Sequence, residues 1–120
     1  MTAAEDIKNM ILDLQKDYIA SIKERMTGYQ RKFKNKEYKY LETEFHKLKG
    51  SGKTYYMDAI SELGGIAEIF FQSKEVNETD FLTILRLLQM IIEKNHDTLT
   101  NKNDFEQQLQ QLKMKFQHKK

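Results

Sequence analysis

Apolar side chains recur along this chain at alternating steps of three and four residues, which is the spacing of one face of an α-helix. No stretch shows sustained alternation of apolar and polar residues, so no β-strand is predicted. The pattern therefore predicts an all-α fold, an antiparallel four-helix bundle with an N-terminal helical extension. The stretches that carry the helical pattern are residues 3–33, 35–56, 58–70, 77–92 and 103–116.

The N-terminal stretch, residues 3–33, predicts one long amphipathic helix. Thr2 and Glu5 are spaced as in a capping box, which marks a helix start. Gly28 is expected to bend or break the helix near its end, so two pieces are allowed. The apolar face of this stretch comprises Ile7, Met10, Ile11, Leu14, Tyr18, Ile22, Met26, Tyr29 and Phe33.

The four later stretches predict the bundle itself, and the two on either side of Met57 should form an antiparallel hairpin. Asn35, Asp58 and Asn77 stand where N-caps are expected, and Asn103 with Glu106 makes a further capping-box pattern. The polar stretch 95–103 separates the last two helices. The residues expected on the apolar faces are Tyr38, Leu41, Phe45, Leu48, Tyr55, Ile60, Leu63, Ile66, Ala67, Phe70, Phe81, Leu82, Leu85, Leu88, Ile91, Ile92, Phe105, Leu109, Leu112 and Phe116.

Composition narrows the class of protein without naming a function. The 120 residues fit one domain over 1–120, and the absence of Pro and Cys argues against turn-rich β folds, disulfide scaffolds and cysteine metal sites. The net charge of +2 indicates a mixed surface and not a polycation. The apolar runs are far shorter than the roughly 20 residues that span a bilayer, and the N-terminus lacks a secretory pattern. We therefore expect a cytoplasmic protein without a membrane partner.

Residues 45–54 combine the residue types that carry chemistry. Gly50-Ser51-Gly52-Lys53-Thr54 is like the end of a phosphate-binding loop, but that motif needs a glycine where this chain has Lys47, and no apolar strand precedes it. If the segment is instead helical, His46, Lys49, Gly50 and Lys53 share one stripe, at i, i+3, i+4 and i+7.

Such a stripe favours an exposed nucleophilic imidazole, with two ammonium groups to balance a phosphoryl charge. Gly50 would leave room for another protein beside His46. If the hairpin turn is centred near Met57, Glu68 faces His46 across the two helices, and its carboxylate can fix the imidazole tautomer. The plain alternatives are a surface histidine without chemistry and a helix that ends early at Gly50 and Gly52.

The run His46-Lys47-Leu48-Lys49-Gly50-Ser51 resembles the His-x-Leu-Lys-Gly-Ser core of histidine-containing phosphotransfer (HPt) domains of two-component phosphorelays. The resemblance covers roughly residues 7–95. It extends to Gly52, to Ile60 and to Glu68, which matches an acidic residue of chemotaxis-kinase-type members. Many members have a glycine ten residues after the histidine, where this chain has Tyr56, so the helix end is expected to close differently.

The resemblance implies a role for each site residue. His46 would accept and donate the phosphoryl group through its outer ring nitrogen, with Lys49 and Glu68 in support. Lys53 is predicted as a further supporting cation from its place on the stripe. Gly50 and Ser51 would lie where a partner docks.

It also implies the partners of a phosphorelay intermediate. These are response-regulator receiver domains and a sensor histidine kinase, and the protein would act as a monomer without ATP-dependent kinase activity of its own. No cofactor or metal of its own is implied, because the receiver supplies the Mg²⁺.

Two other functions are considered. Residues 23–40 hold seven Lys or Arg, interleaved with aromatic residues, as in some nucleic-acid-binding modules. At helical spacing most of these aromatics fall on the core face, so a solvated basic surface, and no nucleic-acid partner, is favoured. An HPt-like adaptor without phosphoryl transfer is the second alternative. His96 and His118 have no neighbours suited to a metal site.

Overall fold

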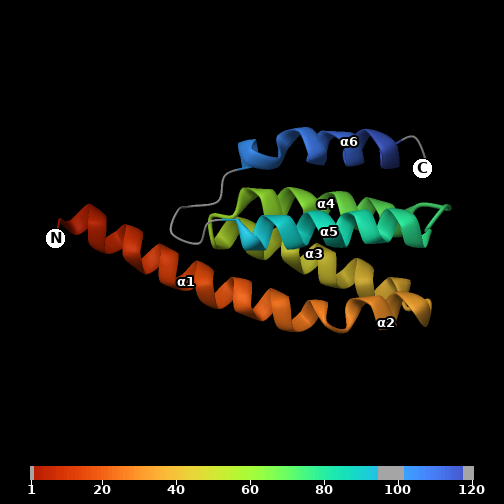
Figure 1. The fold of residues 1–120 in the computed structure, drawn as a ribbon, viewed down its shortest axis with the longest axis horizontal. Coiled ribbons are helices and arrows are strands. Elements are labelled where there is room, and N and C mark those ends of the chain that lie inside the picture. Colours follow the sequence, from red (N-terminus) through yellow and green to blue (C-terminus); the bar gives the residue numbers. More distant parts are fainter. Residues whose placement is uncertain (1, 95–101, 118–120) are drawn as a thin grey trace.

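The computed structural model of the protein describes residues 2–94 and 102–117. All regular structure in this part of the chain is helical, which confirms the predicted all-α class, and the packing is consistent with the predicted bundle (Figure 1). In the described residues no helix has both the length and the apolar character needed to cross a membrane. The elements are α1 (Ala3–Met26), α2 (Tyr29–Lys34), α3 (Tyr38–Thr54), α4 (Asp58–Gln72), α5 (Glu78–Glu93), a 3-10 turn (Lys102–Phe105) and α6 (Glu106–Gln117).

The N-terminal stretch forms two helices, α1 and α2, separated at Thr27 and Gly28 as the glycine predicted. The first half of α1 makes little contact with the bundle and extends past its end (Figure 1). On the predicted apolar face, Ile7, Met10 and Leu14 are each more than half exposed. Burial begins further along the helix, at Gln15 and Tyr18. The amphipathic pattern therefore continues beyond the part of α1 that the bundle covers.

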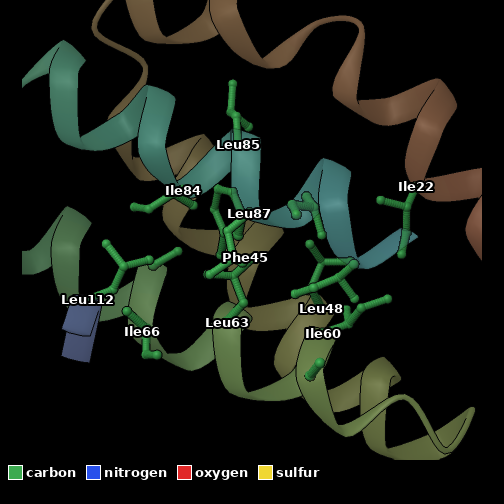
Figure 2. Packing of buried hydrophobic residues seen from close by; sticks show 14 of the residues in the cluster. Ile22, Phe45, Leu48, Ile60, Leu63, Ile66, Ile84, Leu85, Leu87 and Leu112 are labelled. Atoms are coloured by element: carbon green, nitrogen blue, oxygen red, sulfur yellow. The ribbon is translucent and has the colours of Figure 1, made fainter. Parts of the chain in front are cut away.

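The core lies between α3, α4 and α5, with α1 and α6 closing its sides. Figure 2 shows side chains of these three helices meeting at the centre, with Ile22 of α1 and Leu112 of α6 at the margins. The predicted apolar faces of α3 to α6 are buried, with Tyr38, Tyr55 and Leu82 only partly so. The helical spacing of apolar residues in the sequence was thus sufficient to identify most of the core.

Two of the predicted N-caps are confirmed and two are wrong. Thr2 Oγ1 accepts the Glu5 N–H at 3.2 Å, and the Asn77 side chain accepts the Asp80 N–H at 2.9 Å. Asn35 instead ends α2, and Asp58 is already the first residue of α4. The predicted Asn103 cap cannot be placed, because the side chain of Asn103 lies outside the described part of the chain.

The two wrong caps share a physical reason, because the preceding helix end is what closes each turn. Lys36 and Tyr56 both adopt the left-handed conformation, with φ of 59°. The following amides donate back across the helix end, Glu37 N to Lys32 O at 2.9 Å and Met57 N to Gly52 O at 2.8 Å. This pattern is the Schellman motif, which normally has glycine at the left-handed position. The turn after α3 therefore closes in the left-handed geometry with Tyr56 in place of a glycine.

The C-terminal end of α3 is fastened to α1. The buried Gln15 side chain donates to the Tyr55 carbonyl at 2.9 Å, satisfying an acceptor that a helix end leaves free. Tyr18 stacks on Tyr55 with ring centroids 4.5 Å apart, and its hydroxyl lies 2.6 Å from Ser51 Oγ. These contacts hold α1 against the helix that carries the candidate site.

Helix α6 is held by its apolar face and by an ion pair with α5. Lys115 Nζ lies 2.6 Å from Oδ1 of Asp80, a carboxylate that is 3% exposed. The Asn77 amide donates to the other Asp80 oxygen at 2.8 Å. The start of α5 and the end of α6 are therefore joined through a buried carboxylate.

Candidate functional site: an imidazole and a carboxylate across two helices

His46 and Glu68 meet across α3 and α4, as the register of the hairpin predicted. His46 Nδ1 lies 2.6 Å from Glu68 Oε2. The His46 side chain is 66% exposed and that of Glu68 is 17% exposed. With its proton on Nδ1, the imidazole donates to the carboxylate and keeps the lone pair of Nε2 for a partner. The pair thus has the geometry of an oriented, accessible nucleophile.

Lys49 lies against the same carboxylate. Its Nζ is 3.9 Å from Glu68 Oε1, so Glu68 contacts His46 with one oxygen and Lys49 with the other. The aliphatic stem of Lys49 crosses Gly65, where an added Cβ would stand 3.5 Å from Lys49 Cδ. Glu68 therefore links the imidazole to an ammonium group that is half exposed.

Backbone contact between α3 and α4 sets the distance between the two halves of the site. A Cβ at Gly64 would lie 2.6 Å from Lys49 N and 2.7 Å from Phe45 O, closer than real Cβ atoms approach. One turn away, a Cβ at Gly52 would lie 2.6 Å from Ser61 N. Ser61 also donates to the Lys49 carbonyl at 2.6 Å. The two helices are thus in contact beside the His46–Glu68 pair.

Gly50 differs from Gly52 and Gly64, because an added Cβ there would meet nothing within 4 Å. Packing gives no reason for a glycine at this exposed position beside His46. The helix continues through it to Thr54, so it does not end early at Gly50. The same continuity excludes a phosphate-binding loop, because residues 50–54 form no loop.

The remaining predicted residues take different places. Lys53 is exposed one turn beyond Lys49 and lines the same shallow hollow as Ser61 and Glu68. Ser51, predicted at the docking surface, is half-buried and bonded to Tyr18 of α1. The structure brings His46, Lys49, Lys53 and Glu68 to one surface between α3 and α4, while Ser51 faces α1.

A second polar cluster lies on another side of α3, toward α1 and α2. The buried Glu44 carboxylate accepts the Tyr29 hydroxyl at 3.2 Å, with Arg25 at 4.0 Å and Lys47 at 3.7 Å. Burial raises the pKa of the Tyr29 phenol well above its usual range, and the charge of Glu44 raises it further. Burial also raises the pKa of Tyr18. Neither phenol is prepared for ionisation, so we interpret this cluster as structural.

The basic segment 23–40 divides between core and surface. Tyr29 and Phe33 are buried and Tyr38 is partly buried, whereas Tyr40 is exposed with the Lys32 ammonium over its ring. Most of its aromatic rings are thus unavailable for stacking on bases. His96 and His118 lie outside the described residues, within which no group of three acidic or histidine side chains is placed to hold a metal ion.

Sequence reasoning missed the residues that shape the site without reacting. These residues lie on α4 and face α3. The two glycines, Gly64 and Gly65, allow the helices to approach, and Ser61 fixes the contact by a hydrogen bond. The adjacent glycines inside a strongly helical pattern were the available signal, because glycine within a helix usually has a packing reason.

Searches among protein-family models, curated proteins and solved structures found no match to this chain.

Proposed function

We propose that this protein is a phosphorelay intermediate that carries a phosphoryl group on His46. The observation that supports this most is the 2.6 Å contact between His46 Nδ1 and Glu68, made by an imidazole that is 66% exposed. An unreactive surface histidine needs no half-buried carboxylate to fix its tautomer. The bare surface at Gly50 and the resemblance of residues 46–51 to HPt domains support the same function.

The transfer step follows from the geometry of the imidazole. The lone pair of His46 Nε2 attacks the phosphorus of an aspartyl phosphate on a receiver domain, in line with the departing oxygen. A nitrogen–phosphorus bond forms, the phosphorus–oxygen bond breaks, and the aspartate carboxylate leaves with the electron pair. The Nδ1–H still donates to Glu68, which offsets the positive charge that the ring acquires. Reversal of these steps on another receiver passes the group onward.

Charge around the phosphoryl oxygens comes from both proteins. In this chain the cations are Lys49, one turn from His46, and Lys53, one turn further. The receiver contributes the Mg²⁺ and the reacting aspartate. The chain's own part is therefore to orient an imidazole, to keep its approach clear and to balance charge.

Phosphorylation can be tested without knowing the partner. Phosphoramidate is a small donor whose phosphorus–nitrogen bond breaks as ammonia leaves. We expect intact-mass measurement at mildly alkaline pH to show a gain of one acid-labile phosphoryl group in the wild type and none in His46→Gln. Receiver domains from the source organism, charged with acetyl phosphate and Mg²⁺, should give the same result. A phosphorylated His46→Gln protein, or a folded wild type that no donor charges, would overturn the proposal.

Two neighbouring lysines provide a matched control. Lys49→Met removes the ammonium beside Glu68, whereas Lys47→Met removes one that pairs with Glu44 on the other side of α3. We expect only Lys49→Met to slow transfer from a receiver. If instead receivers bind without transfer, the adaptor function is favoured. Salt-dependent binding to an oligonucleotide, without phosphorylation, would favour the nucleic-acid function.

A further inference from the structure

The first half of α1 has the properties of one side of a protein contact. We call residues 3–14 the overhang, because they lie before the first buried residue of α1 and extend past the bundle (Figure 1). Ile7, Met10 and Leu14 are exposed and recur at i, i+3 and i+7, so they form one apolar stripe. Asp6 and Asp13, followed by Asp17 just beyond the overhang, recur at i, i+7 and i+11 and form an acidic edge along one side of the stripe.

The other side of a contact lies on the same chain. A groove runs between the α1–α2 junction and α5, with a partly apolar floor of Met26, Leu82 and Leu85. Lys23 and Arg86 stand exposed on its rim, and the exposed carboxylate of Glu93 lies at the far end along α5. Along α5 the groove extends from Leu82 to Glu93, about three helical turns or roughly 17 Å, which is the length of the overhang. An apolar helix with an acidic edge thus matches this partly apolar groove in length, and its aspartates complement the two exposed cations Lys23 and Arg86.

We propose that the overhang of one molecule docks into this groove on a second copy, so that the protein self-associates head to tail. The overhang cannot reach its own groove, because α1 is one unbroken helix that already contributes Lys23 to the groove. Antiparallel pairing of two overhangs is disfavoured, because it brings the same edge of both helices together and sets aspartates against aspartates. The inference departs from the expected monomer and does not depend on the chemistry of His46.

Head-to-tail contact has a property that a symmetric contact lacks. Each molecule uses two different surfaces, so a variant with a broken overhang still offers an intact groove. A variant with a broken groove still offers an intact overhang. The two variants together can therefore form a pair that neither forms alone.

Sedimentation equilibrium over a concentration series tests the proposal. Met10→Glu disables the overhang and Lys23→Glu/Arg86→Glu reverses the rim, all at exposed positions where the fold should persist. We expect the wild-type mass to rise with concentration, both variants to stay monomeric, and their equimolar mixture to form a heterodimer that grows no further. High salt should weaken the wild-type association. Met114→Glu, which removes an exposed methionine on α6, should associate like the wild type.

Each opposite result is decisive against head-to-tail docking. A wild type that stays monomeric at every concentration overturns it, as does a Met10→Glu protein that still associates. Rim variants that associate normally would show that the overhang binds elsewhere, and a monomeric mixture would show that the groove is not its receptor. Dispersal by Met114→Glu would indicate unspecific apolar contact instead. Circular dichroism on each variant confirms that the helices remain.

Discussion

Glu68 and Asp80 each contact a basic side chain of another helix at 2.6 Å, but they differ in how far they and their partners are exposed. Asp80 is 3% exposed, is bonded by Lys115 and Asn77, and joins the end of α6 to the start of α5. Glu68 is half-buried, at 17% exposed, and its partner His46 is 66% exposed. One carboxylate is enclosed by its partners, whereas the other leaves its partner's second nitrogen accessible.

The difference separates two uses of the same contact. A buried carboxylate loses its hydration and must be matched by protein groups, so its removal chiefly changes stability. A carboxylate that contacts an exposed imidazole contributes little to the free energy of unfolding. Its main effect is to fix the orientation and tautomer of the ring. Substitution of Asp80 should therefore lower stability and leave phosphoryl transfer unchanged. Substitution of Glu68 should slow phosphoryl transfer and change stability little.

The largest effect on stability is expected at the buried pair. Asp80→Ala removes the anion that holds Lys115 and the acceptor of the Asn77 amide, and we expect a loss of about 3 kcal/mol in the free energy of unfolding. Urea denaturation followed by circular dichroism measures this. Phosphorylation of His46 in the folded fraction should be unchanged. A loss below about 0.5 kcal/mol would place Asp80 with the surface ion pairs.

The glycines of the α3–α4 contact give the next effect. Gly64→Ala forces a methyl group against backbone atoms of Phe45 and Lys49, so the helices must separate, at a cost of about 2 kcal/mol. Gly50→Ala is the matched control, because its methyl group meets open space. That variant should gain up to about 1 kcal/mol from the better helix propensity of alanine.

The same pair of variants tests how the site is positioned. Separation of the helices should lengthen the His46–Glu68 contact, which 15N chemical shifts of the imidazole report directly. We expect Gly64→Ala, and not Gly50→Ala, to shift the tautomer signals. Equal stability of both variants would contradict the backbone contact.

Glu68→Gln should show the reverse of Asp80→Ala. The amide is nearly isosteric but cannot stabilise the positive ring that forms on phosphorylation, so we expect transfer to His46 to slow about tenfold or more. The free energy of unfolding should change by less than about 1 kcal/mol. Glu62→Gln on the same helix is the control and should leave the rate unchanged. If Glu68→Gln leaves the rate of phosphoryl transfer to His46 unchanged, Glu68 does not position the imidazole. That result would leave the phosphorylation of His46 itself untouched.

The cluster at Tyr29 extends the comparison to alkaline pH. The pKa of the Tyr29 phenol is raised in the folded state. Its contribution to stability is therefore complete below the ordinary phenol pKa near 10 and is lost as pH rises above that value. We expect the wild type to lose stability above that pH, and Tyr29→Phe to lose less. At neutral pH, Tyr29→Phe should cost about 1 kcal/mol for the hydrogen bond to Glu44. Thermal melts across the alkaline range distinguish these outcomes.

Sequence reasoning succeeded where periodicity alone decides and failed where the surroundings decide. The face of Leu41, Phe45 and Leu48 was predictable, and with it the exposed position of His46 opposite Glu68. The exposure of Met10 was not, because a helical pattern does not reveal how much of the helix the bundle covers. The inward hydrogen bond of Ser51 depends on where α1 crosses α3, which no local pattern encodes.

The left-handed residues after α2 and α3 are positions at which substitution should raise thermal stability. Lys36 and Tyr56 carry side chains where glycine has no steric cost, and a left-handed side-chain-bearing residue costs about 1 kcal/mol. Lys36→Gly and Tyr56→Gly should each raise the melting temperature, by roughly 3–5 °C for a chain of this size. Neither change touches the residues around His46. A thermostable form of this bundle should therefore be reachable through its turns alone.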